Sequence, residues 1–328
     1  MTMGLCFNFY PKEKNMKKSR IFFAILIAGI ELLSYFGGAV WYDMLFFGIG
    51  GLLVFLKFEE VMKIPRELFA SRGMVLTLAK NDFKTRFAGS YFGFFWALVN
   101  PIVTILLYYF IFTVAFHSGP VNGKPYVLWM VGGLVPWFLF QEGLSNGTNA
   151  LIEYTYLVKK VSFQVSVLPV IKIVSASFFH LFFVVIMTLI YTVMGYFPGI
   201  TMIQLIYYYV CMVVLLMAID YATCAIVVFF RDLGQIIGIF MQVFMWLTPI
   251  LWNDVTQLQA YPTLQFIFKL NPMYYVVEGY RDSMLDHIWL VEQTRLCLGL
   301  YFWGAVMILF VIGTGIYKKL KPHFADVL

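Results

Sequence analysis

Few side chains in this 328-residue chain could do chemistry, and two of them are charges inside apolar sequence. Lys172 and Asp220 lie in two separate apolar runs. A charge at the centre of a membrane helix costs about 2.5–3.5 kcal/mol on insertion scales, so such residues are candidates for function. The two are predicted either to form a structural ion pair between neighbouring helices, which we favour, or to hold a proton or an ion.

The residue types that build catalytic and metal sites are scattered along the sequence. The four histidines lie far apart, and the four cysteines contain no CxxC pair. No nucleophile, base and orienting group can be assembled. The string SGPVNGKP differs from a phosphate-binding loop in its spacing and in its last residue. The sequence therefore predicts no catalytic residue, no metal, no cofactor and no ATP site in this chain.

The composition places these residues in a membrane protein. Hydrophobic residues make up 62% of the chain and charged residues only 12%, whereas soluble domains average about 25% charged. Backbone groups in lipid must be bonded within their own segment, which favours helices over open strands. The net charge of +6 comes from residues between the apolar runs, so a nucleic-acid partner is not expected.

A helix that spans a bilayer needs about 20 largely apolar residues. The first two candidate runs are short and share the turn Gly37-Gly38, which predicts a hairpin. The candidate runs are Ile21–Phe36, Val40–Leu56, Gly93–Phe116, Tyr126–Asn146, Val167–Tyr196, Met202–Phe230, Leu233–Trp252 and Leu296–Tyr317.

Lysine and arginine concentrate in every second connection between these runs. Cytoplasmic loops of membrane proteins carry the excess of such residues. The pattern predicts a multi-pass membrane protein with both termini in the cytoplasm.

Two connections have unusual patterns. Within residues 63–90, the residues Phe69, Leu76 and Phe83 recur at helical spacing among basic residues, which predicts an amphipathic helix lying in the headgroup plane. An ordinary cytoplasmic linker is the alternative. The connection of about residues 253–293 holds two short apolar pieces broken at Asn271-Pro272, which predicts re-entrant half-helices.

Aromatic residues make up 20% of the chain, and most are expected to face lipid or the membrane interface. Some cluster towards helix ends, where ring faces could form a sliding surface for sugars. The candidates for such a translocation path are Tyr108, Tyr109, Phe112, Phe116, Phe240, Phe244, Trp246, Tyr274 and Tyr275.

An ordered set of motifs resembles the bacterial ABC exporter permeases, in the branch that exports O-antigen, capsular polysaccharide and teichoic acid. Asp82-x-Lys84-x-Arg86-Phe87, followed by Ser90-x-x-Gly93-x-x-Trp96, resembles the start of the first core helix. The strings FFRDLGQI, LTPILW, KLNPMYYVVEGYRDSML and YKKLKPHFADVL follow in the order of that branch. The resemblance covers roughly residues 75–328. The hairpin before Lys57 and the pair Phe163-Gln164, often Phe-Pro in the family, depart from the pattern.

The resemblance implies an all-α polytopic protein with a six-helix permease core, the amphipathic helix, outer re-entrant half-helices and the extra hairpin. We divide the chain into residues 1–62 (basic tail and hairpin), 63–90 (interfacial helix), 91–318 (core) and 319–328 (cytoplasmic tail). Two copies would work with two copies of a separate ATPase, which binds ATP and Mg²⁺, to move a lipid-linked polysaccharide or teichoic acid polymer outward. The ATPase-contact candidates are Glu153, Tyr156, Lys159, Lys160, Phe163, Arg231 and Asp232.

The lipid-headgroup or gate candidates follow from the same resemblance: Lys80, Lys84, Arg86, Tyr91 and Trp96. Their cations could attract the pyrophosphate of a carrier lipid, or they could simply anchor the helix on the cytoplasmic side. Alternatives for the whole chain are an ABC permease for a small lipophilic substrate or drug, and a membrane glycosyl- or acyltransferase.

Overall fold

The computed structural model describes residues 13–36, 41–86, 94–160 and 163–328, and these residues form helices and loops with one isolated β-bridge, between Val121 and Lys124. The long and medium helices are α1 (Glu13–Phe36), α2 (Trp41–Leu56), α3 (Phe58–Ala70), α4 (Arg72–Thr85), α5 (Phe94–Tyr109), α6 (Tyr126–Glu153), α8 (Leu168–Val193), α9 (Gln204–Val227), α10 (Leu233–Leu247), α12 (Pro262–Lys269), α13 (Pro272–Arg281) and α14 (Gln293–Leu320). The short ones are η1 (Phe110–Ala115), α7 (Thr155–Val158), η2 (Val165–Val167), η3 (Ile200–Ile203), α11 (Asp254–Gln257), η4 (Asp282–Asp286), η5 (Lys321–His323) and α15 (Phe324–Val327).

The all-helical membrane architecture is confirmed. Helix α10 has 15 residues, about 22 Å at 1.5 Å per residue, and is shorter than the hydrocarbon layer. Among the described residues, the segments long and apolar enough to cross a membrane are Leu98–Ala115, Tyr126–Glu153, Val165–Val193, Ile200–Val227 and Gln293–Val327.

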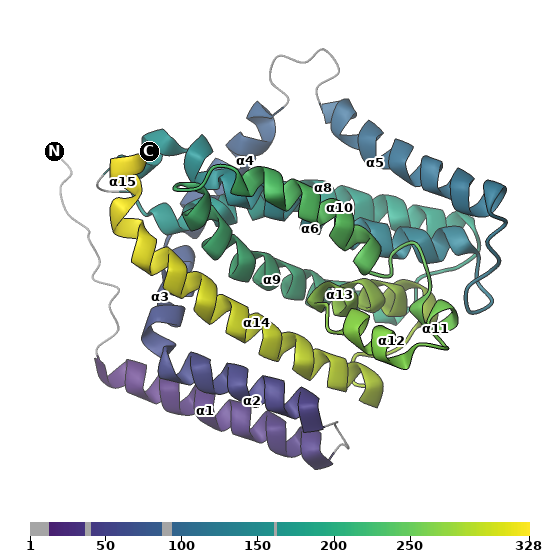
Figure 1. The fold of residues 1–328 in the computed structure, drawn as a ribbon, viewed down its shortest axis with the longest axis horizontal. Helices are drawn as coiled ribbons and strands as arrows, with labels where there is room; N and C mark the ends of the chain where they lie inside the picture. The colour runs from purple at the N-terminus through teal and green to yellow at the C-terminus, as the bar shows by residue number, and fades with distance from the viewer. Residues whose placement is uncertain (1–12, 37–40, 87–93, 161–162) are drawn as a thin grey trace.

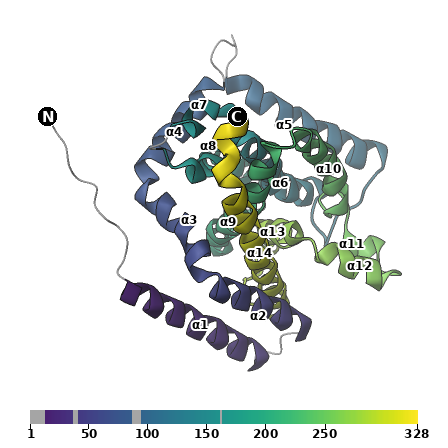
Figure 2. The ribbon, with the colours of Figure 1, turned by 60° about the vertical axis from the view of Figure 1, so that its left-hand side comes forward.

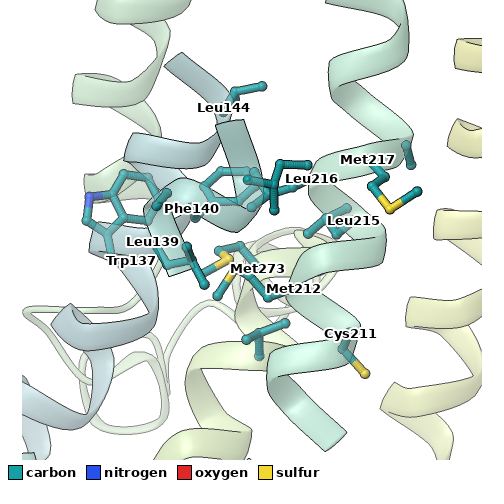
Figure 3. Close-up of a cluster of buried hydrophobic side chains, with 14 of the residues drawn as sticks. Trp137, Leu139, Phe140, Leu144, Cys211, Met212, Leu215, Leu216, Met217 and Met273 are labelled. Atoms are coloured by element: carbon teal, nitrogen blue, oxygen red, sulfur yellow. The ribbon is translucent and has the colours of Figure 1, made fainter. Parts of the chain in front are cut away.

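Helix α6 lies at the centre and packs against α8 and α9, while α9 packs against α14. Figure 3 shows Leu139 and Phe140 of α6 on the side of Met212 and Leu216 of α9. Trp137 points away from α9, and its ring lies 6.1 Å from that of Phe244 on α10. Hydrophobic burial does not drive association between helices in lipid, so close packing must hold them. Gly143 of α6 provides that proximity, because a Cβ there would stand 2.6 Å from a methyl group of Leu216.

The two ends of the bundle differ in character. We call the end that carries α7, α15 and the start of α10 the basic end, because Lys159, Lys160 and Lys319 lie there. We call the other end, which carries α11 and α12, the opposite end (Figure 1).

The N-terminal hairpin is an integral part of this bundle. Helix α2 packs along α14, and α1 packs on the outside of α2. Gly50 and Gly304 stand at the crossing of α2 and α14, where a Cβ on Gly304 would lie 2.5 Å from the backbone of Phe46. Figures 1 and 2 place this hairpin on one side of the bundle and α5 on the other.

The sequence predicted one amphipathic helix over residues 63–90, and the structure has two helices, α3 and α4, which meet at Ser71. Helix α4 packs on α8 and buries Val75, Ala79 and Asp82. Phe69 and Leu76 of the predicted apolar face are exposed by 71% and 50%. Phe83, the third residue of that face, packs instead on Phe178 and Phe179 of α8 at 5.4 and 4.9 Å, so the predicted apolar face is divided between the protein and its surroundings.

At the opposite end the chain breaks into short helices, at the position that the sequence indicated. Asn271 caps α13, since its side chain accepts a hydrogen bond from the N–H of Met273 at 2.9 Å, and Pro272 occupies the first helical position. Helix α12 buries no residue, whereas α13 packs against α6, α9 and α14.

Arg281, at the end of α13, satisfies backbone groups left open by these breaks. Its guanidinium donates to the carbonyls of Trp129, Pro249 and Ile250 at 3.2, 2.9 and 2.9 Å. It stacks over the Trp129 ring at 3.5 Å and is 1% exposed. One side chain thus joins α13 to the start of α6 and to the residues that follow α10.

We expect Gly304→Ala to weaken the contact between α2 and α14, because the new methyl group would overlap the backbone of Phe46. Overpacking of this kind costs about 1–3 kcal/mol. Thermal unfolding of the purified chain in detergent should show a lower melting temperature. Gly315→Ala is the matched control on the same helix, since a Cβ there meets nothing within 4 Å. Equal melting temperatures for the two variants would contradict this account of the hairpin.

Candidate functional site

The buried charges meet where α4 packs on the bundle near the basic end. Lys172 of α8 donates to Asp82 of α4 at 2.6 Å and also pairs with Glu153 at the end of α6. The hydroxyl of Tyr154 donates to Asp82 at 2.7 Å. Lys172 and Asp82 are 5% and 8% exposed. One ammonium group therefore connects α4, α6 and α8.

The pKa of Asp82 follows from these contacts. Burial alone would raise the pKa of this carboxyl, but the hydrogen bonds from Lys172 and Tyr154 hold it below its ordinary value. Because the folded pKa lies below the unfolded one, the contact stabilises the fold above about pH 4. That contribution is lost as the pH falls through the folded pKa.

The predicted pair of Lys172 with Asp220 is wrong. Lys172 reaches α4 and the end of α6 instead. Asp220 is fully buried, and neither of its carboxyl oxygens has a hydrogen-bond partner in the described part of the chain. Its carboxyl group lies against α6 at Gly147, where any side chain would overlap it.

The predicted headgroup residues divide into two groups. Arg86 forms an ion pair with Glu142 of α6 and lies 5.7 Å over the Phe179 ring, so it anchors the end of α4 to the bundle. Lys80 and Lys84 are exposed on α4, and Trp96 is 53% exposed on α5. Tyr91 lies outside the described residues.

The predicted ATPase-contact residues lie together at the basic end. Tyr156 on α7 is 60% exposed, and Glu153, Lys159 and Lys160 beside it are exposed. Phe163 is half-buried against the core.

The turn between α9 and α10 adds a second exposed group at this end. Arg231 and Asp232 are exposed, and Gly234 lies beside Asn149 of α6. Phe229 and Phe230, which are 43% and 46% exposed next to Arg231, were not predicted as contact residues. Their position directly before the charged Arg231-Asp232 turn could have indicated them.

The aromatic path candidates on α5 and α10 face outward together. No described residue of Leu98–Ala115 is buried, and Tyr109 and Phe116 are exposed. On α10, Phe240 and Trp246 are 49% and 53% exposed.

The other candidates on these two helices are more enclosed. Phe244 stacks on Phe240 at 5.0 Å, and Phe112 is half-buried. The Tyr108 hydroxyl lies 3.8 Å from the Met245 sulfur, so the end of α5 contacts the end of α10. We call the exposed aromatic residues of α5, η1 and α10 the aromatic face.

The two remaining path candidates are not on this face. Tyr274 and Tyr275 are 4% and 5% exposed within α13. Tyr274 donates to Asp254 at 3.3 Å, and the Tyr275 ring packs on Phe302 at 5.1 Å. Since α13 is packed inside the bundle, these tyrosines hold it there and do not line an exposed surface.

No group of three or more His, Cys, Asp or Glu that could hold a metal ion occurs among the residues that the structure describes. The structure instead offers surfaces for binding: helix α4, which ion pairs hold on the bundle, the exposed basic end and the exposed aromatic residues of α5 and α10.

We expect Lys172→Met to loosen α4, because it removes the nearest cation of the buried Asp82 and leaves Arg86, 3.8 Å away, as its remaining ion-pair partner in the described part of the chain. Breaking a buried ion pair from one side costs about 3–5 kcal/mol. In membranes, a Val75→Cys reporter on the buried face of α4 should then react faster with a maleimide.

Adding Asp82→Asn to Lys172→Met should slow that reaction again, because the uncompensated charge is removed. Lys84→Met, an exposed lysine on the same helix, is the control and should leave the rate unchanged. A rate unaffected by Lys172→Met would show that the ion pair does not anchor α4.

Comparison of the sequence with known proteins shows the family to which the chain belongs. The ABC-2 type transporter family matches residues 74–285, from α4 to η4. The chain is 26% identical over 274 residues to the O-antigen export system permease protein RfbA of Myxococcus xanthus, covering 81% of this chain and 99% of that protein. It is 25% identical over 256 residues to two proteins of the same name from Klebsiella pneumoniae, covering 78% of this chain and 95% of each. The chain is a multi-pass membrane subunit that belongs to the ABC-2 type transporter family.

Proposed function

We propose that this chain is the permease subunit of an ATP-driven exporter that moves a lipid-linked polysaccharide or a teichoic acid polymer across the plasma membrane. The names of the three relatives support a glycan as cargo. ATP and Mg²⁺ are bound by a separate ATPase subunit, and this chain does not hydrolyse ATP itself. Its own task is to provide a protein-lined path through the apolar layer.

The observation that carries this proposal is the uncovered face of α5 and α10. A helix with no buried residue over Leu98–Ala115 gains little packing from its own chain. A second copy placed against this face would enclose Tyr109, Phe240 and Trp246 between the two subunits. Ring faces accept the C–H groups of a sugar without fixed hydrogen-bond geometry, so a polymer can slide past them.

The basic end faces the cytoplasm in this proposal, in accordance with the excess of lysine and arginine there. In the assembled transporter, one ATPase copy docks on the basic end of each of the two permease copies. Tyr156, Phe229 and Phe230 offer exposed rings beside Lys159 and Arg231, and aromatic residues with arginine are typical of interface centres.

The carrier lipid approaches along α4. Lys80 and Lys84 are exposed on this helix, and ammonium groups at headgroup level attract phosphate groups. Arg86 has a different task, because its ion pair with Glu142 holds the end of α4 in place.

The purified chain in proteoliposomes should translocate no lipid-linked glycan on its own, because it lacks a phosphate-binding loop. Adding the partner ATPase and MgATP should start translocation, measured as protection of the glycan from an external glycosidase. An ATPase whose P-loop lysine is replaced is the control and should be inactive. Translocation by the chain alone, driven by a proton gradient, would contradict the proposed function.

We expect Lys80→Gln combined with Lys84→Gln to slow export while leaving membrane insertion intact, because both lysines are exposed and unnecessary for packing. Each lysine near an anionic surface contributes about 1 kcal/mol, so the loss of both should lower export by about thirtyfold at limiting substrate. Lys319→Gln with Lys321→Gln, two exposed lysines at the same end, is the matched control. Equal export by the two double variants would remove the headgroup role.

A further inference from the structure

A cavity of about 390 Å³ opens at the opposite end of the bundle, between the loop that follows η1 and the start of α11. Four aromatic side chains contribute to its wall: Phe112, Phe116, Tyr126 and Trp252. Phe112 and Phe116 were also candidates for the translocation path, whereas the rest of this wall has no part in the proposed path.

The aromatic wall is held in place by its own contacts. The Tyr126 hydroxyl donates to the carbonyl of Leu251 at 2.7 Å, and its ring stacks with Phe112 at 5.7 Å. The Trp252 indole donates to the carbonyl of Trp246 at 2.9 Å. Phe116, by contrast, is 68% exposed at the rim. The rings are thus positioned before any ligand arrives, which lowers the entropic cost of binding.

The backbone beside the cavity has an unusual conformation. The π-helix η1 ends there, and π-helical turns are frequent at functional sites. His117 has a φ of 51°, in the left-handed region that non-glycine residues rarely adopt. Asn122, also at 51°, and Gly123 form the tight turn between Val121 and Lys124, where asparagine and glycine readily take this conformation.

The polar groups of the cavity are all uncharged. The amides of Asn122, Asn253 and Gln257 line it, with hydroxyl groups nearby. Asn253 uses its side-chain oxygen to cap α11, which leaves its amide N–H groups as donors. Lys124, the cation closest in sequence to this wall, is paired with Asp286 at 2.8 Å.

Aromatic faces combined with neutral amides match one class of ligand. The C–H face of a pyranose packs on a ring, and its hydroxyl groups exchange hydrogen bonds with amides, which both donate and accept. A phosphate or a carboxylate would instead require arginine, lysine or a helix terminus, and the wall supplies no charged side chain.

We propose that this cavity binds one uncharged sugar residue of a glycan at the face where the polymer emerges. The identity of the emerging polymer rests on the proposed function, whereas binding of a free sugar requires only the cavity. The proposal also distinguishes between the two cargo classes, because a neutral hexose fits the wall and an anionic polyol phosphate does not.

Saturation-transfer NMR on the full-length chain in nanodiscs tests the proposal. The probes are the methyl glycosides of mannose, galactose and glucose, with glycerol 3-phosphate as the anionic counterpart. We expect transfer to at least one glycoside and none to glycerol 3-phosphate.

Two variants remove the cavity's contacts without removing its supports. Phe116→Ala deletes an exposed ring, and Asn122→Gly deletes an amide while keeping the left-handed backbone. Each should weaken glycoside binding about fivefold, the equivalent of about 1 kcal/mol. Trp289→Ala, a 46%-exposed ring outside the cavity wall, is the control and should bind as the unmodified chain does.

The possible failures can be told apart. No transfer to any of the glycosides, equal binding by the Phe116 and Asn122 variants, or preference for glycerol 3-phosphate would overturn the cavity proposal, even if the complete transporter exports glycan normally. Glycoside binding that depends on Phe116 and Asn122, in a transporter that exports no glycan, would support the cavity and contradict the proposed function.

Discussion

The structure depends on one constraint, which the hydrocarbon layer imposes: water is not available there to form hydrogen bonds with backbone or side-chain polar groups. Unbroken helices meet this constraint by themselves, but the chain also contains breaks after α10 and before α13. Arg281 meets it there, with three carbonyls and the Trp129 ring around one guanidinium. Asn271 contributes the cap of α13 and a hydrogen bond to Thr248 at 2.7 Å. These contacts allow short helices to be buried at the opposite end, and they leave the loops above them in a defined position.

The same constraint explains the charges near the basic end. Lys172 is tolerated because Asp82, Glu153 and Tyr154 surround it. The arrangement joins α4, which we predict to lie at headgroup level, to the end of α6, from which α7 and the exposed residues Tyr156 and Lys159 follow directly. A docked subunit that displaces α7 would therefore also displace α4, through the ion pairs of Lys172 with Glu153 and Asp82. In the proposed exporter, this is a direct connection between the ATPase surface and the helix that meets the carrier lipid.

The exposed apolar surface has two different characters. The hairpin α1–α2 adds to the side of α14 and exposes aliphatic and aromatic residues in the manner of a lipid-facing helix. Helices α5 and α10 form a face on which rings are concentrated and where the chain provides little packing of its own. A single subunit is in this view half of a channel, with its aromatic side open. The cavity beside Trp252 lies where such a channel would end, so that the polymer would meet aromatic contacts both within the layer and at its exit.

The sequence by itself determined the membrane character, the helical class, the break at Asn271-Pro272 and the charged residues exposed at the basic end. Each of these depends on composition, on spacing or on local turn chemistry, which are properties of neighbouring residues. Tertiary structure alone decided that Lys172 meets Asp82 and not Asp220, that Arg86 pairs with Glu142, and that Tyr274 and Tyr275 are enclosed. It also decided that α3 and α4 divide at Ser71, because the bend lets Val75 and Ala79 reach α8. The partners in these two ion pairs lie 56 and 90 residues apart. The packing of the helices therefore decides which charges meet, and it leaves Asp220 without a hydrogen-bond partner among the described residues.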